Sequence, residues 1–305
     1  MASSVSKSRP SIYETITDKI VAAIESGPGD PVMPWQRAGA RPVLPVNAAT
    51  RQAYRGVNIL SLWVTALERD FASGEWATFK QWHAKGATVR KGEKASPIVF
   101  YRQYDKFDET AANDDEPDKV FVARGYWVFA AEQVDGYEVA PALPPHPIAR
   151  RAAADAYFAA TGARIIVGGA QACYRPATDT VHMPDEARFM DIDGRSRSDA
   201  FYAVLGHGFA HFTGAPNRLA RDFGKRFGDD AHCLEEACAE ICAAFLCARL
   251  GIAAEPHPEH ARYVLHWLTV MKANPRAVFA AAAKAQEAVA YLDGFQVAQS
   301  EQVAA

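Results

Sequence analysis

The stretch from Ser11 to Gly27 repeats apolar residues at a helical spacing. Isoleucines stand at positions 12, 16, 20 and 24, so they share one face of a helix. Ser11 and Glu14 have the spacing of a capping box, which satisfies free backbone N–H groups where a helix begins. Gly27 supplies a stop signal at the other end. The pattern therefore predicts an amphipathic helix between Ser11 and Gly27.

A second helix and two strands are predicted after a proline-rich connection. The stretch NILSLWVTALERDFASG (58–74) carries apolar residues at helical spacing, and Asn58 is a suitable N-cap. The stretches PIVFYRQY (97–104) and KVFVARGYWVFAAEQV (119–134) are rich in β-branched and aromatic residues, which favours strands. The acidic segment between them is expected to form a solvated hairpin loop.

A Pro-rich segment, EVAPALPPHPI, is the best candidate for a domain boundary because its four prolines favour an extended linker. A chain of 305 residues is also long enough for two domains, each with its own core. We therefore expect domains at 8–138 and 149–298, joined by a linker at 139–148.

The two domains differ in their predicted content. The second is expected to begin with a helix at 149–160 and to contain strands in ARIIVGG and DTVHMP, and the rest reads as helix. The predicted fold class is α+β, with a mixed α/β first domain and a mostly helical second domain that holds a small sheet.

Composition favours a soluble globular protein, since 49% of residues are hydrophobic and 23% are charged. The amino terminus lacks the apolar core of a secretory signal, and charged residues interrupt the longest apolar runs, so a cytoplasmic location without a membrane is expected. Four of the five cysteines fall between Cys233 and Cys247 at wider spacings than CxxC pairs. They are predicted to be reduced core residues.

The motif GHGFAHFTG places His207 and His211 four positions apart. On a helix they share a face and can direct nitrogens to one point about 2.0–2.1 Å from each. Three glutamates interrupt the apolar helix CLEEACAEICAAFLC, and buried glutamates are usually paired or bound to metal. We predict that His207, His211 and Glu236 ligate a metal and that Glu240 holds a ligating histidine. Glu235 is expected to be solvated.

Two histidines and one glutamate form the ligand set of a zinc site with an open fourth position. Zn²⁺ is therefore the expected cofactor, although the same set accepts Mn²⁺, nickel or iron.

The stretches FYAVLGHGFAHFTG, NRLARDFG and EEACAEICAAFLCARLGI resemble the zincin-like metallopeptidase domain of the ArdC family of plasmid antirestriction proteins. In the first half, YRGVNILSLW, WATFKQWHAKGATVRKGEK and VFAAEQVDGY resemble the N-terminal single-stranded DNA-binding domain of that family. The resemblance spans nearly the whole chain. It implies that the protein binds single-stranded DNA and shields plasmid DNA entering a recipient cell from restriction endonucleases.

The chain departs from the family at Gly208, because the first motif of the family is normally HExxH. In such enzymes the glutamate takes a proton from metal-bound water, which glycine cannot do. Glycine inside a helix also costs roughly 1 kcal/mol relative to alanine, and nothing in the local sequence favours it. We therefore expect a metal site that has lost its general base, naturally or by introduction, and lacks peptidase activity.

The first domain interleaves aromatic and basic residues over positions 54–101. Single-stranded DNA binding uses this mixture, because cations follow phosphates while aromatic faces stack on bases. From Lys80 to Arg102 six basic residues stand against one acid, although the net charge of the whole chain is -3. That stretch is therefore expected to attract polyanions.

Not every ring in this stretch can be exposed. Trp63 is expected in the core, and Trp76 and Phe79 partly so. The predicted DNA contacts are Arg55, Lys80, Arg90, Lys91 and Lys94 for phosphates and Trp82 and Tyr101 for bases. Nothing resembles a recognition helix or zinc finger, so binding is predicted to be independent of sequence, with double-stranded DNA bound more weakly.

Three functional classes remain open. The first is a DNA-binding protective protein with an inactive metallopeptidase-like domain, and it accounts for both halves of the chain. The second is an active zinc metalloprotease recruited to DNA that cleaves a host restriction-system protein, which requires that Gly208 replaces a native glutamate. The third is an interaction module whose histidines are core residues, and it predicts no stoichiometric metal.

Overall fold

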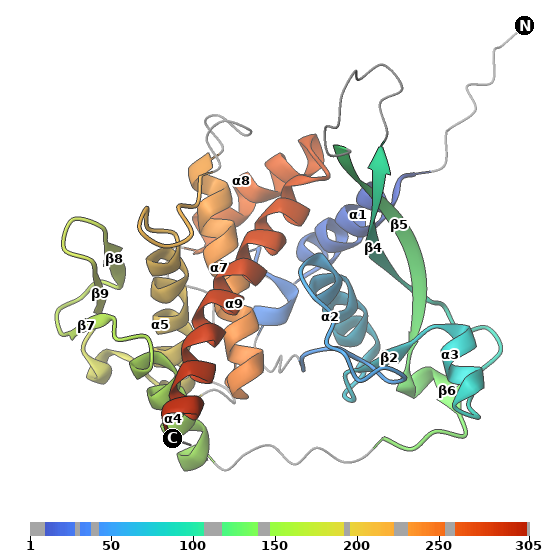
Figure 1. The fold of residues 1–305 in the computed structure, drawn as a ribbon, viewed down its shortest axis with the longest axis horizontal. Helices are drawn as coiled ribbons and strands as arrows, with labels where there is room; N and C mark the ends of the chain where they lie inside the picture. Colours follow the sequence, from blue (N-terminus) through green and yellow to red (C-terminus); the bar gives the residue numbers. More distant parts are fainter. Residues whose placement is uncertain are drawn as a thin grey trace, which may run out of the picture.

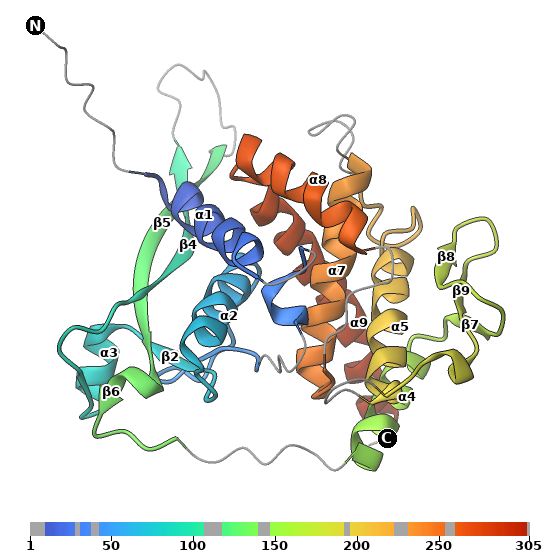
Figure 2. The same ribbon diagram turned by 180° about the vertical axis from the view of Figure 1, so that it is seen from behind.

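The computed structural model describes residues 10–27, 31–37, 43–106, 118–139, 147–191, 196–222, 231–253 and 260–303. A central group of helices lies between two unequal β regions (Figures 1 and 2). The long β4–β5 ribbon stands on one side and the small β7–β9 sheet on the other. Most of the predicted linker and acidic loop lie outside the described residues.

The first predicted helix is confirmed as α1 (Ile12–Glu25), which begins with the predicted capping box between Ser11 and Glu14. Helix α2 (Val57–Arg69) begins one residue before the expected cap, because Gly56 occupies the N-cap position. Asn58 exchanges two hydrogen bonds of 2.8 Å with the backbone of Val99 instead. The predicted cap at Asn58 is therefore wrong, and this side chain ties α2 to the neighbouring sheet.

The N-terminal half contains a four-stranded sheet in the order β1-β2-β5-β4 and a two-stranded sheet of β3 and β6. The two long predicted strands are confirmed as an antiparallel pair, β4 and β5. The strands are β1 (Val46–Asn47), β2 (Glu75–Ala77), β3 (Thr88–Val89), β4 (Ser96–Lys106), β5 (Asp118–Ala130) and β6 (Val134–Asp135). The short helical segments are η1 (Pro34–Gln36), α3 (Phe79–Ala84) and η2 (Ala131–Gln133).

The C-terminal half is mostly helical with a three-stranded sheet in the order β7-β9-β8, as the α+β prediction requires. Its strands are β7 (Arg164–Val167), β8 (Cys173–Arg175) and β9 (Thr180–Met183). Its helical segments are α4 (Pro147–Ala159), η3 (Glu186–Arg188), α5 (Arg197–Thr213), α7 (Ala231–Leu250), α8 (His260–Ala273) and α9 (Ala277–Val303). In the part of the chain that the structure describes, no helix is long and apolar enough to cross a membrane.

One hydrophobic core joins α1 and α2 to the helices of the C-terminal half. Trp63 of α2 is buried as predicted. Its ring packs between Trp35 of η1 and Phe245 of α7, whose ring centroids are 5.9 and 5.7 Å away. The expectation of a separate core for each half is therefore wrong for α1 and α2, because these helices share the core of the C-terminal half. The four cysteines of α7 form no disulfide and are buried in the shared core, as expected.

Candidate metal centre

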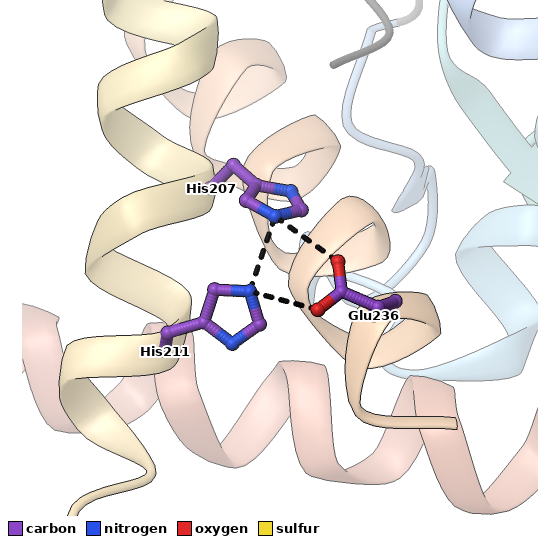
Figure 3. Close-up of side chains that lie close together, drawn as sticks. All are labelled: His207, His211 and Glu236. Carbon is purple, nitrogen blue, oxygen red and sulfur yellow. Dashed lines mark hydrogen bonds and ion pairs between the residues drawn. The ribbon is translucent and has the colours of Figure 1, made fainter. Parts of the chain in front are cut away.

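The two histidines of the motif lie on α5, and their rings face α7 (Figure 3). His207 Nε2 and His211 Nε2 are 3.1 Å apart. Glu236 of α7 reaches toward both, with Oε2 at 3.5 Å from His207 and Oε1 at 3.5 Å from His211. The structure thus brings together the three predicted ligands.

These distances match a metal site. Ligand atoms that are each about 2.0–2.1 Å from one tetrahedral ion lie roughly 3.3–3.4 Å from one another. The three donor atoms belong to one group whose members all lie within 4.8 Å of one another. His207 and His211 supply nitrogens and Glu236 supplies an oxygen, a set suited to a divalent transition metal.

Glu240 lies one turn after Glu236 and is buried, with 6% of its surface exposed. Its Oε1 is 3.3 Å from His207 Nδ1, and its Oε2 accepts a 2.7 Å hydrogen bond from Gln36 Nε2. A carboxylate can only accept, so in the neutral ring that a metal would bind the proton belongs on Nδ1, which leaves the Nε2 lone pair for the ion. Glu240 therefore lies where the predicted role requires it, and Gln36 of the N-terminal half secures it.

The prediction that Glu235 is solvated is wrong. Its carboxylate accepts two 2.7 Å hydrogen bonds from Arg221, whose side chain is 1% exposed, and it lies 3.1 Å from His211 Nδ1. Glu235 thus orients His211 as Glu240 orients His207. The sequence shows no signal for this pair, because Arg221 precedes the helix of Glu235 and has no periodic relation to it.

The ion pairs set the protonation of the metal-free site. Burial raises the pKa of Glu235, but the hydrogen bonds from Arg221 and His211 outweigh it and lower this pKa to about 2. Burial lowers the pKa of His207, but Glu236 and Glu240 reverse that effect and raise it to about 9. Without metal, the His207 ring is therefore protonated and positively charged at neutral pH, while the lowered pKa values of Glu235 and Glu236 keep these two carboxylates charged.

Metal affinity should rise by about tenfold for each pH unit between pH 7 and 8.5, because a metal must displace the proton of His207. The protonated fraction of His207 falls only as pH approaches its pKa of about 9, so binding strengthens with pH over this whole window. Chelator-buffered Mn²⁺ titrations of the full chain measure this slope. Glu240→Gln removes one partner that raises the pKa and should flatten the slope, whereas an unchanged affinity in the original chain would contradict the assignment.

Gly208 lies inside α5, where β9 approaches the helix. A Cβ atom at this position would lie 2.9 Å from Cγ1 of Val181, which is fully buried on β9. The expectation that nothing local favours glycine is therefore wrong. The close approach of Val181 favours a residue without a side chain, in the position that HExxH assigns to glutamate.

An open cavity of about 420 Å³ leads to the three predicted ligands. His232, Tyr174 and Tyr263 also line it. His232 is exposed and is not part of the ligand group, although its charge acts on Glu236.

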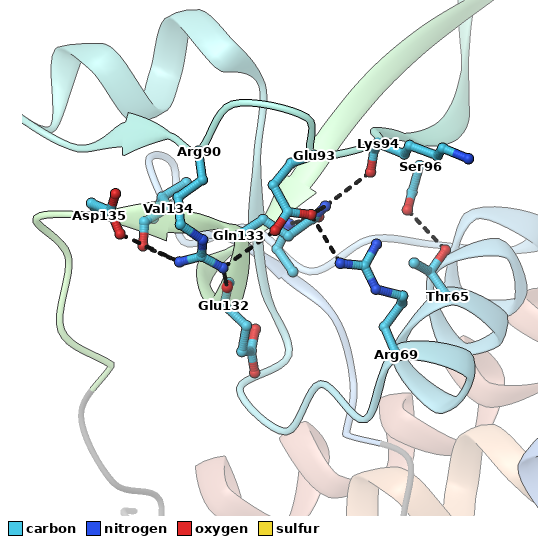
Figure 4. A network of polar contacts seen from close by, with 11 residues as sticks. Thr65, Arg69, Arg90, Glu93, Lys94, Ser96, Glu132, Gln133, Val134 and Asp135 are labelled. Atoms are coloured by element: carbon cyan, nitrogen blue, oxygen red, sulfur yellow. Dashed lines mark hydrogen bonds and ion pairs between the residues drawn. The ribbon is translucent and has the colours of Figure 1, made fainter.

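Two of the residues predicted to contact DNA have structural roles. Trp82 is fully buried and donates a 2.9 Å hydrogen bond from Nε1 to the Phe129 carbonyl, so the prediction that it stacks on a base is wrong. Arg90 donates to the carbonyls of Glu132 and Val134 and pairs with Glu93 (Figure 4). Its guanidinium holds the turn between β3 and β4 against the segment around β6, which makes it a poor candidate for a phosphate.

The remaining predicted contacts are accessible. Arg55, Lys80, Lys91 and Lys94 are all exposed. Tyr101 is 45% exposed and interacts with Tyr13 of α1. These positions remain predictions.

The two rings that were expected to be partly buried, Trp76 and Phe79, differ from each other in the structure. Trp76 is buried, at 1% exposure, whereas Phe79 is 56% exposed. The prediction that Phe79 is partly in the core is therefore wrong.

Two protein families match the chain in succession. Residues 10–129 match the N-terminal domain of anti-restriction factor ArdC, and residues 152–284 match a zincin-like metallopeptidase family. The matches fall on the mixed α/β half and the helical half respectively.

Similar sequences include proteins of very different length. An uncharacterized protein y4eC of Sinorhizobium fredii is 45% identical, over 90% of this chain and 89% of its own. A DNA primase TraC of Escherichia coli is 32% identical over 95% of this chain, which spans 28% of that protein.

Two solved structures share the fold over almost the whole chain. The metal-free crystal structure of antirestriction ArdC protein from the R388 plasmid is 36% identical, covers 93% of this chain and 97% of its own, and has a TM-score of 0.72. The Mn(II)-bound structure of the same protein is 34% identical, covers 94% and 98%, and has a TM-score of 0.70. The likeness therefore extends to sequence as well as fold.

Proposed function

Because the chain belongs to the ArdC family of antirestriction proteins, we propose that it binds single-stranded DNA through its N-terminal half and protects incoming plasmid DNA from restriction. The observation that carries the proposal is the likeness to antirestriction ArdC over 93% of the chain. The exposed cations Arg55, Lys80, Lys91 and Lys94 support it, since they can follow a phosphate backbone.

The C-terminal half is proposed to hold a divalent metal, with zinc as the first candidate, on His207, His211 and Glu236. A related ArdC protein has been solved with Mn(II), which supports a divalent ion in this fold. Such an ion supplies activation of a bound water. When the ion is bound, Glu240 and Glu235 would hold the two rings at Nδ1 and so leave both Nε2 lone pairs for the metal. Gly208 offers no group that takes a proton, so the site is proposed to bind metal without hydrolysing peptides.

Single-stranded DNA binding should weaken steeply with salt. Four phosphate contacts give an expected loss of affinity on the order of 50-fold between 50 and 200 mM salt. Fluorescence anisotropy with a labelled single-stranded oligonucleotide measures this loss, and the matching duplex should bind more weakly at each salt concentration. Equal affinity at both concentrations would contradict the electrostatic part of the proposal, and a preference for the duplex would contradict its choice of strand.

A further inference from the structure

Two aromatic side chains on the β4–β5 ribbon are exposed without a packing reason. Phe100 and Tyr126 are 63% and 43% exposed, and their rings meet edge to face with centroids 6.4 Å apart. Alternation along the strands places both on one face of the ribbon, where Ile98 pairs with Tyr126 and Phe100 with Arg124. Adjacent exposed aromatic rings form an apolar patch, and such patches mark interaction sites.

The same face borders a cavity of about 860 Å³, which we call the β4–β5 hollow. Phe100 and Tyr126 form one wall, and Arg55 comes from the segment before α2. Asn47 and Gln81 add amide groups to the lining, and a 3.2 Å hydrogen bond between them holds these amides in place. The hollow thus combines aromatic faces with fixed polar groups and a cation.

Charge indicates what occupies the hollow. None of the described residues that line it is acidic, and Arg55 belongs to the lining. Arg124, opposite Phe100 in the strand register, is also exposed. An anionic chain with flat, stackable groups fits this surface, and nucleic acid has that chemistry. In a duplex the base faces are already stacked, so only an unpaired strand can present them to Phe100 and Tyr126.

We propose that the β4–β5 hollow seats unpaired bases of single-stranded DNA, with Phe100 and Tyr126 as stacking platforms and Arg55 on the adjacent phosphate. This inference rests on the proposed function and adds the site that recognises the bases. It replaces the buried Trp82 as the source of base contacts. Phe100 lies within the predicted strand PIVFYRQY, but only the fold reveals that its ring is left outside the core.

The test compares Phe100→Ala and Tyr126→Ala in the full chain with Trp127→Ala as the matched control. Trp127 neighbours Tyr126 on β5 and is 57% exposed, but it does not line the hollow. Each of the first two changes should weaken binding to a 20-nucleotide oligo-dT by roughly 5- to 150-fold, and Trp127→Ala by less than about twofold. Because all three rings are exposed, thermal unfolding should stay near that of the original chain.

An abasic oligonucleotide of the same length separates base contacts from phosphate contacts. It should bind the original chain and Phe100→Ala with equal affinity, since it has no bases to stack. If the original chain binds no single-stranded DNA, the proposed function fails. If it binds oligo-dT and the Phe100 and Tyr126 variants bind equally well, or if Trp127→Ala causes the same loss, the hollow is not the base site and only this inference is overturned.

Discussion

Replacement of His207 by alanine is expected to weaken Mn²⁺ and Zn²⁺ binding by more than about 100-fold. Loss of a group that merely orients a ligand typically costs 10–100-fold, and His207 is itself a proposed ligand. Its Nε2 lies 3.1 Å from His211 Nε2 and 3.5 Å from Glu236, so its removal leaves one nitrogen and one carboxylate. Chelator competition and metal analysis of the purified protein measure the effect.

His232→Ala is the matched control for this change. His232 lines the same cavity but does not belong to the group of possible ligands, so its removal should leave metal affinity within about twofold. Equal metal content in the original chain and His207→Ala would rule out the assigned site. An equal loss in both variants would mean that the cavity binds metal through a different set of histidines.

Gly208→Glu combined with Val181→Ala is expected to produce peptide hydrolysis that the original chain lacks. A positioned general base contributes about 10²- to 10⁴-fold to rate, and glutamate at 208 would complete the HExxH motif. The single change should fail, because a Cβ at 208 would lie 2.9 Å from Val181 Cγ1. Such overpacking costs about 1–3 kcal/mol of stability. The second change removes the obstructing methyl group.

Hydrolysis of fluorescently labelled casein by the metal-loaded proteins provides the measurement. Val181→Ala alone is the control and should bind metal without cleaving the substrate. Robust cleavage by the original chain would show that another group serves as base and would refute the inactive site. A double variant that folds and binds metal but remains inactive would show that the chain lacks more than the base.

The grouping of the proposed metal ligands was predictable because a helix converts sequence spacing into geometry. His207 and His211 share a face of α5, as do Glu236 and Glu240 on α7, and a buried helix does not tolerate unpaired glutamates. Arg221 could not be found in this way, since its contact with Glu235 depends on how the segment after α5 returns toward α7. The pairing of Arg221 with Glu235 becomes visible only once the two segments are packed together.

The nucleic-acid surface was less predictable for a similar reason. Composition indicated a mixture of rings and cations, but not which rings face outward. Trp82 is buried because α3 packs onto the small β3–β6 region. Phe100 shares a ribbon face with Ile98, yet Ile98 is buried in a cluster with Leu62 of α2 while Phe100 is 63% exposed. Likewise, Asn58 has the residue type of a cap, yet the approach of β4 offered it two backbone partners.

The hydrogen bond from Gln36 to Glu240 links the two halves of the chain, so it limits how the halves can be separated or exchanged with those of a related protein. A fragment that begins after the Pro-rich segment would keep the buried carboxylate of Glu240 but lose its 2.7 Å donor. It would also expose the Phe245 ring that Trp63 covers. The C-terminal half on its own would therefore lack two contacts that support its metal site and its core. We therefore expect an exchange of the C-terminal half with a relative to preserve its metal site only when the N-terminal helices of the same protein accompany it.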